Sequence, residues 1–399
     1  MKKHIFTVLF LMLALMTFGQ QWVAIDSNTP STLRTTLISS SEDQITVNVQ
    51  VPGFFATEIT TPRGVANIIS VPKTVSTAAA GEPNLPMIAI PAIIGDHQHY
   101  SIRVVESQHT DFMMEVAPSK GDFPRSINPE DVPYTFGEAY STDAFFPTEN
   151  VGLYNPYILR DFRGQNMAVY PFAYNAATHT LRVYHNLTIE LYSDRQSGTN
   201  LLDRHSSVVK MDPETGAMYA NHFINYNESL GRYTPVVETG ELLIICHDAF
   251  MEAMQPFVNW KKQIGRPTTM VGTSTAGTTS SAIKAYIQSQ YDANPNLTHV
   301  LLVGDVAQIP GNTYTAGSYG GKSDNMYGQV AGNDLYNDII IGRFSAENET
   351  HVTTQVNKVI HYERDINATD TWLTFGDGIG NGDGPGHFGE TDWQHIERS

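Results

Sequence analysis

The pattern of hydrophobic and polar residues divides the chain into two parts. Up to about residue 231, β-branched and aromatic residues alternate with polar ones in short runs, as in residues 44–51, 100–107 and 179–193. Turn-forming residues separate these runs, and no segment of useful length has helical spacing. Alternation of this kind predicts an antiparallel sandwich or barrel.

Beyond residue 231, apolar strand-like runs alternate with segments of helical periodicity. The expected strands are residues 242–248, 267–272, 299–305 and 338–344, and the expected helices are residues 249–265, 280–293 and 351–366. A βαβα succession predicts a doubly wound parallel sheet flanked by helices. Gly265 is expected to stop the first helix after Ile264.

Two of these strands bracket the stretch with the most candidate chemistry. The run at 299–305 ends in Asp305, and the run at 338–344 follows the sequence AGNDLYND, which contains Asp334 and Asp338. Carboxylates delivered by strand ends to one edge of a parallel sheet are typical of an α/β enzyme site. We therefore expect Asp305, Asp334 and Asp338 to share that edge.

Composition narrows the class of protein. A length of 399 residues allows two domains, and a net charge of −17 argues against nucleic acid as a partner. A Lys pair, an apolar segment and a small residue at position 19 predict a secretory signal peptide over residues 1–19 and export to the periplasm. Cys246 is the one cysteine, so no internal disulfide is possible, and its apolar surroundings in LLIICHD are typical of an inert thiol.

Several blocks of the second part resemble the gingipain family of cysteine endopeptidases, closest to its Arg-specific members. These blocks are YTPVVETGELLIICHDAF, FVNWKKQIGRPT, LTHVLLVGDVAQIP, KSDNMYGQVAGNDLYNDIIIGRFSAEN, VIHYERDI and ETDWQH. The β-rich residues 20–232 are similar in position and character to the family's propeptide. The resemblance implies a secreted zymogen in which residues 20–232 are an inhibitory propeptide. Residues 233–399 would then be the first part of a caspase-like gingipain catalytic domain, incomplete at the C-terminus.

The resemblance implies that the active site is only partly inside this chain. The family's catalytic His and Cys fall beyond Ser399, so we expect the chain alone to be inactive. Asp383 in GNGDGPG matches the acid that orients the catalytic His. Asp392 in ETDWQH matches the acid at the base of the S1 pocket, where paired charge-assisted hydrogen bonds would select arginine in protein and peptide substrates.

The resemblance also implies structural calcium. Asp305, Glu390 and His395 resemble one site, although Ile396 stands where relatives supply a carboxylate. The second site would combine two carbonyls and two carboxylates, from Ala331, Tyr336, Asp334 and Asp338. Hard oxygen donors in a tight loop suit calcium, but a loop rich in Asn and Asp can instead form hydrogen bonds within itself.

The junction between the two parts contains a candidate processing site. Arg232-Tyr233 falls where the family's mature enzyme begins, so an Arg-specific enzyme is expected to cut its own propeptide after Arg232. A propeptide arginine is further expected to occupy the S1 pocket before release. Arg125, in an extended, proline-flanked segment, is the best candidate, with Arg160 and Arg163 as alternatives.

Other functions remain open. The absence of the family's catalytic His and Cys from this chain is also compatible with a nonenzymatic protein. That protein would be a calcium-stabilised surface or adhesion module on a decayed protease fold. A nucleotide-binding domain is disfavoured because the sequence has neither G-x-G-x-x-G nor a P-loop. His97 and His99 alternate on one strand and could bind a metal, but without a third ligand a surface position is favoured.

Overall fold

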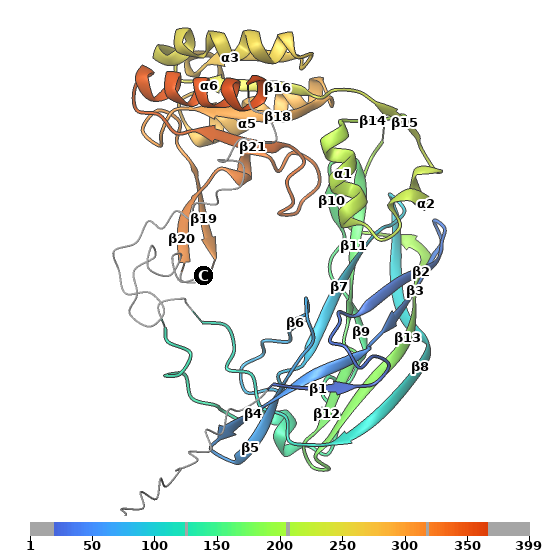
Figure 1. Ribbon diagram of the computed structural model, residues 1–399. Helices are drawn as coiled ribbons and strands as arrows, with labels where there is room; N and C mark the ends of the chain where they lie inside the picture. Colours follow the sequence, from blue (N-terminus) through green and yellow to red (C-terminus); the bar gives the residue numbers. More distant parts are fainter. Residues whose placement is uncertain (1–19, 124–126, 205–207, 317–318, 366–399) are drawn as a thin grey trace, which may run out of the picture.

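The computed structural model describes residues 20–123, 127–204, 208–316 and 319–365. They form a β-rich N-terminal domain and an α/β C-terminal domain, which lies at one end of the β-rich body (Figure 1). The expected succession of a β-rich region and an α/β region is therefore confirmed. Within these ranges, no helix is both long and apolar enough to cross a lipid bilayer.

The N-terminal domain is built from antiparallel strands in three sheets. Their orders are β1-β4-β5, β10-β11-β7-β6 with β9 beside β11, and β12-β13-β3-β2 with β8 beside β13. The strands are β1 Gln21–Ala24, β2 Arg34–Ser40, β3 Gln44–Gln50, β4 Gly53–Thr61, β5 Gly64–Ser70, β6 Val75–Ser76, β7 Pro86–Ile93, β8 Gln98–Met113, β9 Val151–Leu153, β10 Tyr157–Leu159, β11 Phe162–Val169, β12 Phe172–Asn175 and β13 Thr180–Ser197. A short 3-10 helix, η1, spans Glu138–Ser141.

The core of this domain lies between its two five-stranded sheets. Val47 on β3 and Ile189 on β13 are buried in one cluster with Ile90 on β7 and Met167 on β11. Because alternate side chains of a strand point to opposite faces, one face of each sheet supplies this core. Burying a side chain of this size contributes about 1.5–3 kcal/mol.

Two helices complete the N-terminal domain, so the expectation that residues 20–231 contain no useful helix is wrong. Helix α1 spans Pro213–His222 and α2 spans Tyr226–Leu230. The Asp212 side chain caps α1 by accepting a hydrogen bond from the backbone N–H of Glu214. Helix α1 carries one buried aromatic side chain, Tyr219, so its apolar positions are too sparse to produce a clear helical period.

The C-terminal domain is an α/β unit around a parallel sheet of order β17-β16-β18-β21. Before it, strand β14 Val208–Met211 pairs in parallel with β15 Thr234–Val237. The remaining elements are β16 Glu241–Cys246, η2 Asp248–Phe250, α3 Met251–Gln263, β17 Thr268–Gly272, α4 Thr273–Ala276, α5 Ser280–Ala293, β18 Leu297–Val303, β19 Asn312–Ala316, β20 Tyr319–Ser323, η3 Asn325–Tyr327, β21 Ile340–Phe344 and α6 Glu349–Arg364. The strands and helices expected here are confirmed, and Gly265 adopts a φ of 90° directly after α3, as a helix stop requires.

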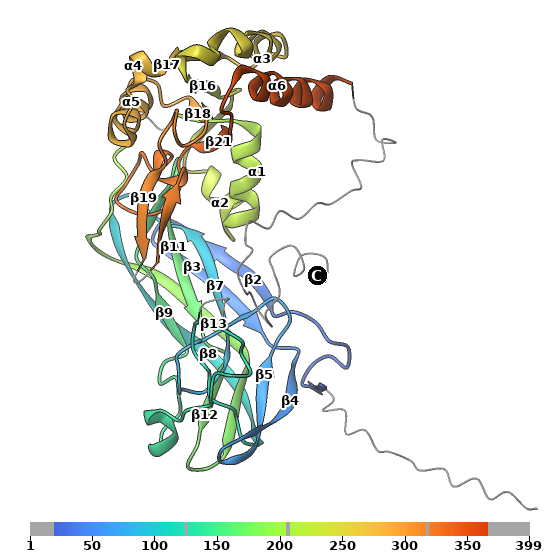
Figure 2. The same cartoon turned by 90° about the vertical axis from the view of Figure 1, so that its left-hand side faces the viewer.

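Helices cover both faces of this sheet. On one face, Met254 of α3 and Val352 of α6 pack with Ile244 of β16. On the other face, Ile283 of α5 packs with the neighbouring β16 residue, Ile245. Figure 2 shows α3 and α6 on one side of the sheet and α5 on the other.

Candidate functional site at the junction of the two domains

The carboxylates expected to share one sheet edge are separated by the sheet. Strands β18 and β21 run parallel, with Val303 opposite Phe344. Asp305 follows the carboxyl end of β18, whereas Asp334 and Asp338 precede the amino end of β21. Parallel strands place like ends at the same edge, so Asp305 lies at one edge and the two other aspartates at the opposite one. The expectation of a shared edge is wrong.

Asp305 sits in a hydrogen-bonded turn at the carboxyl edge. Its backbone N–H donates to the carbonyl of Ala346 at 2.9 Å, and its carboxylate accepts from the Ser345 hydroxyl at 3.1 Å. Five further residues with inferred roles lie outside the described residues. They are Asp383 (orienting the catalytic His), Asp392 (the S1 pocket), Glu390 and His395 (the first calcium site) and Arg125 (the preferred inhibitory arginine). The roles inferred for them stay predictions.

Asp338 is buried where the loop of residues 331–338 meets the N-terminal domain. One carboxylate oxygen accepts from the backbone N–H of Arg160 at 2.8 Å, and the other accepts from those of Val330 at 2.9 Å and Ala331 at 2.7 Å. Burial raises the pKa of Asp338 to about 6, while the three amide donors act in the opposite direction. Three main-chain donors therefore engage both oxygens of this carboxylate.

Asp334 makes the second contact of this loop with the N-terminal domain. Its Oδ2 accepts from the backbone N–H of Ile158 at 2.7 Å and from the side-chain amide of Asn200 at 2.8 Å. Its Oδ1 accepts from the backbone N–H of Tyr336 at 2.9 Å. The Asn200 carbonyl oxygen in turn accepts from the backbone N–H of Asn333 at 2.8 Å.

These contacts decide how well the loop fits a calcium ion. Calcium binds oxygen lone pairs at about 2.3–2.6 Å, and here each carboxylate accepts three N–H hydrogen bonds, which leaves one of its roughly four lone-pair sites. The calcium role inferred for Ala331, Asp334, Tyr336 and Asp338 stays a prediction. Among the residues that the structure describes, no group of three His, Cys, Asp or Glu side chains is arranged to hold a metal.

Arg160 crosses from the N-terminal into the C-terminal domain. It lies in the turn between β10 and β11 with a φ of 52°, and only 4% of its surface is exposed. Its guanidinium donates to the carbonyls of Leu297 at 2.7 Å and Asp338 at 3.2 Å, and also to that of Pro295. The Asp161 carboxylate lies 3.4 Å from its Nε. A guanidinium held by these carbonyls is not available to an S1 pocket. The prediction that Arg160 could be the inhibitory arginine is therefore wrong.

Arg163 is excluded from that role as well, because it is fully buried inside the N-terminal domain. Burial lowers the pKa of its guanidinium. Its donors are all directed at main-chain carbonyls within 2.9 Å, those of Gly95, Gln98, Thr199 and Asn200. Arg163 therefore ties loops of its own domain together.

Aromatic rings add a further contact between the two domains at this loop. The rings of Tyr157 and Tyr336 stack with centroids 3.9 Å apart and an interplanar angle of 13°. The Tyr157 hydroxyl lies 2.7 Å from Nε2 of His222, and burial raises the pKa of Tyr157. Sequence reasoning missed Tyr157, Ile158 and Asn200, because their partners are far along the chain and no local pattern marks them.

A second contact joins α1 to the parallel sheet. The buried Asp212 carboxylate accepts from the backbone N–H of Gly240 at 2.7 Å and lies 3.3 Å from Nη1 of Arg266. Burial acts to raise the pKa of Asp212, but the amides of Gly240 and Glu214 and the Arg266 charge outweigh it and hold that pKa below its usual value. His299 lies between Glu214 and Arg266, at 2.9 and 3.1 Å, and burial followed by the Arg266 charge lowers its pKa.

The expected cleavage site is a folded turn between α2 and β15. The backbone N–H of Arg232 donates to the carbonyl of Ser229 at 3.1 Å, and its guanidinium donates to the Ser229 hydroxyl at 2.9 Å. The Tyr233 ring packs 5.5 Å from that of Phe162, and the Arg204 guanidinium lies 4.5 Å from its centroid. Cleavage after Arg232 therefore requires this turn to open first.

The remaining cysteine and histidine candidates have surroundings that are typical of structural residues. Cys246 is fully buried, and burial raises the pKa of its thiol to about 12, as expected for an inert residue. His97 and His99 lie at the surface, each beside a carboxylate, Asp203 and Asp194 respectively. The surface position expected for the two histidines is confirmed.

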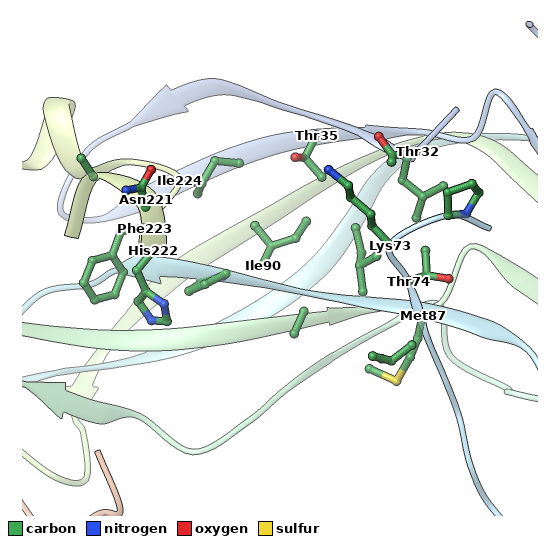
Figure 3. A pocket seen from close by; sticks show the side chains of 17 residues that line it. Thr32, Thr35, Lys73, Thr74, Met87, Ile90, Asn221, His222, Phe223 and Ile224 are labelled. Atoms are coloured by element: carbon green, nitrogen blue, oxygen red, sulfur yellow. The ribbon is translucent and has the colours of Figure 1, made fainter. Parts of the chain in front are cut away.

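A cavity of about 700 Å³ lies within the N-terminal domain and is shown in Figure 3. Thr32, Lys73, Met87, Ile90 and His222 are among the residues that line it. Its lining combines apolar side chains with Lys73 and His222 and contains no carboxylate or thiol. The cavity therefore offers neither a carboxylate nor a thiol for chemistry.

Comparison with protein-family models assigns both domains. Residues 28–215 match the model of the C25 propeptide, and residues 237–395 match that of peptidase family C25. The chain joins a C25 propeptide to a C25 peptidase segment. The two matches fall on either side of the turn at Arg232.

Known relatives agree with this assignment. Gingipain R2 of Porphyromonas gingivalis is 35% identical over 369 residues, which are 90% of this chain and 49% of that protein. Gingipain R1 of Porphyromonas gingivalis is 35% identical over 368 residues, 90% of this chain and 36% of that protein. Lys-gingipain of the same organism is 25% identical over 361 residues, 84% of this chain and 20% of that protein. The chain thus spans about half the length, or less, of the curated relatives it matches.

Solved structures give weaker matches. The complex of Porphyromonas gingivalis RgpB pro- and mature domains is 29% identical, covering 49% of this chain and 97% of that chain, with a TM-score of 0.45. The Arg specific cysteine proteinase gingipain R is 37% identical, covering 42% of this chain and 39% of that chain, with a TM-score of 0.32. At these TM-scores the matches carry no structural argument.

Proposed function

We propose that the chain is the first part of a secreted zymogen whose complete form is a cysteine endopeptidase that cleaves after arginine. A C25 propeptide followed in the same chain by a C25 peptidase segment is the observation that carries this proposal. Residues 20–232 would form a propeptide of the sandwich or barrel class. Residues 233–399 would form the beginning of a caspase-like peptidase domain.

The nucleophile has to come from outside this sequence. Cys246 is its one cysteine, and a buried thiol with a pKa of about 12 supplies almost no thiolate at neutral pH. We therefore assign the reactive Cys and its His to a part of the protein beyond Ser399. The N-terminal domain would act as an intramolecular inhibitor until it is released.

Specificity for arginine is proposed to come from Asp392, with Asp383 as the residue that orients the catalytic His. The 35% identity to gingipains R1 and R2 supports this assignment. A recessed carboxylate would take a guanidinium through two parallel charge-assisted hydrogen bonds. Proteins and peptides with arginine before the cleaved bond would be the substrates.

The test is the activity of the complete gene product, measured on matched peptides with arginine or lysine at the P1 position. We expect hydrolysis after arginine, and an Asp392→Asn variant should lose on the order of 100-fold or more in kcat/KM for that substrate. Asp292→Asn, an exposed substitution on α5, is the matched control. A complete product without peptidase activity would instead support the calcium-stabilised adhesion module.

Export and structural calcium complete the proposal. Residues 1–19 would direct the protein to the periplasm, and surface or extracellular delivery would follow. Asp305, with Glu390 and His395, would bind one structural calcium ion. Asp334 and Asp338, with the carbonyls of Ala331 and Tyr336, would bind a second.

A further inference from the structure

We propose that the C-terminal domain carries a binding pocket for a small organic monocarboxylate with an unbranched apolar chain. The pocket has a volume of about 290 Å³ and lies between the parallel sheet and the helices α3 and α6, which cover one of its faces (Figure 2). It is lined by residues near the amino ends of β16, β18 and β21, at the edge of the sheet opposite Asp305. The proposal does not depend on peptidase activity.

A glycine in β21 creates the space. Side chains two residues apart on a strand share a face, so Ile340, Gly342 and Phe344 face the two helices. Leu301 of β18 lies opposite Gly342 and lines the same pocket. Among the described residues, a Cβ added at Gly342 would meet a single atom within 4 Å, Cδ1 of Leu301 at 3.7 Å. The missing side chain therefore leaves a gap in this layer of the core.

Apolar side chains enclose the gap. Phe257 of α3 and Val359 of α6 cover it from the helix side, and Leu242 of β16 lines it from the sheet. Lys261 also lines the pocket, but its Nζ lies 2.5 Å from the Glu363 carboxylate. Because that ion pair compensates the Lys261 charge, the interior suits an apolar chain.

The mouth of the pocket, by contrast, offers two hydrogen-bond donors, on Arg266 and His299. Nη1 of Arg266 lies 3.1 Å from Nδ1 of His299. A guanidinium can only donate, so Nδ1 accepts and the proton of the neutral ring lies on Nε2. The Nε2–H of His299 and Nη2 of Arg266 are therefore the donors that can meet an anion.

A side chain of the chain itself shows which anion fits these donors. The Nε2–H of His299 donates to Oε2 of Glu214 at 2.9 Å, and Nη2 of Arg266 lies 3.5 Å from Oε1. The Glu214 side chain is 61% exposed, so it can leave the mouth without opening the core. The buried Asp212 carboxylate lies 3.3 Å from Nη1 of Arg266 and would repel a dianion such as a phosphate monoester. A monocarboxylate is therefore the head group that matches the mouth.

The spacing along β18 indicates the length of the apolar chain. His299 and Leu301 are two residues apart, about 7 Å along the strand. A chain of several methylenes that starts at His299 therefore reaches the gap above Gly342, and octanoate is a suitable probe. Each methylene that enters the gap should tighten binding about fourfold.

A series of ligands tests the pocket on the whole, unaltered chain. Titration calorimetry with acetate, butyrate, hexanoate and octanoate should show an affinity that rises about fourfold per methylene. Octanamide, which has the same chain without the charge, should bind at least about tenfold more weakly than octanoate. Equal affinities for acetate and octanoate, or for octanoate and octanamide, would overturn the proposal.

A variant that fills the gap tests its position. Gly342→Val should keep the thermal midpoint of unfolding or raise it, because a β-branched residue suits a strand and its Cβ has room. Its affinity for octanoate should fall at least about tenfold. Lys73→Gln, at an exposed lysine that lines the cavity of the N-terminal domain, is the control and should bind octanoate as the wild type does. Wild-type affinity in a folded Gly342→Val variant would show that octanoate binds elsewhere and would overturn the proposal.

A variant at the mouth tests the head group. Glu214→Gln removes the carboxylate that competes with the ligand, so octanoate should bind about tenfold more tightly than in the wild type. Glu228→Gln, at an exposed glutamate of α2, is the matched control and should leave the affinity unchanged. The same affinity in Glu214→Gln as in the wild type would contradict the assigned mouth. No readout uses peptidase activity, so the proposed function can fail without affecting the result.

Discussion

The ring of Tyr336 lies flat on that of Tyr157, 3.9 Å away, and so joins a loop of the C-terminal domain to an edge strand of the N-terminal one. The polar contacts of Asp334 and Asp338 surround this stack. The junction therefore combines apolar and charged contacts, and each kind leads to a separate prediction.

Removing the aromatic contact should loosen the junction. We expect Tyr336→Ala to reduce the free energy of unfolding of the chain by about 1–3 kcal/mol, because ring burial and stacking are lost together. A double-mutant cycle with Tyr157→Ala should give a coupling energy of about 0.5–1.5 kcal/mol, measured by urea denaturation. Tyr154→Ala, at a tyrosine that is 49% exposed, is the control, and a coupling energy near zero would contradict the prediction.

The pH dependence of stability should report on His299. Burial and the Arg266 charge lower its pKa in the folded chain, so the unfolded chain takes up the proton first as the pH falls. Stability is therefore fully present above the unfolded value of about 6.5 and is lost as the pH drops below it towards the folded pKa. Asp212 and Glu214 face the same ring and limit the size of the loss.

The measurement for His299 is the thermal midpoint of unfolding between pH 7.5 and pH 5, compared with a His299→Gln variant. The wild type should lose more stability over this range than the variant, because the variant has no ring to protonate. His97→Gln, at an exposed histidine, should follow the wild-type curve. Parallel curves for wild type and His299→Gln would refute the role of this ring.

Cys246 should not react while the chain is folded. Its thiol is fully buried and has a pKa of about 12, so both access and thiolate formation are suppressed. Labelling with iodoacetamide at pH 8, followed by mass spectrometry, should be at least about 100-fold slower than in urea. Labelling of the folded chain at the rate seen in urea would show that the thiol is exposed and reactive.

Processing should depend on Arg232. In the complete gene product, we expect the mature N-terminus to begin at Tyr233, as determined by N-terminal sequencing. Arg232→Ala should abolish that terminus, because an acidic S1 pocket has no partner for alanine. Arg195→Ala is the control for an exposed arginine, and an unchanged mature N-terminus in Arg232→Ala would rule out cleavage at this bond.

The residue pattern by itself determined the four strands of the parallel sheet and the three long helices that cover it. The periodicity that defines α5 or β18 is local, and burial on both faces of β18 leaves a continuous apolar run that can be read directly. Gly265 could be placed as a helix stop for the same reason, since only nearby residues set its backbone angle. Helix α1 was not predicted from the sequence, because its buried positions are few and its N-terminal cap depends on one side chain, that of Asp212.

Only the tertiary structure decided what the acidic residues bind. Their edges follow from the parallel sheet that the sequence predicted, because Asp305 follows β18 whereas Asp334 and Asp338 precede β21, and the expectation of one shared edge overlooked this order. Their partners, Ile158 and Arg160, are 176 and 178 residues away along the chain. A carboxylate takes whichever donor the fold brings within hydrogen-bonding distance, and periodicity, a local property, carries no information about that donor.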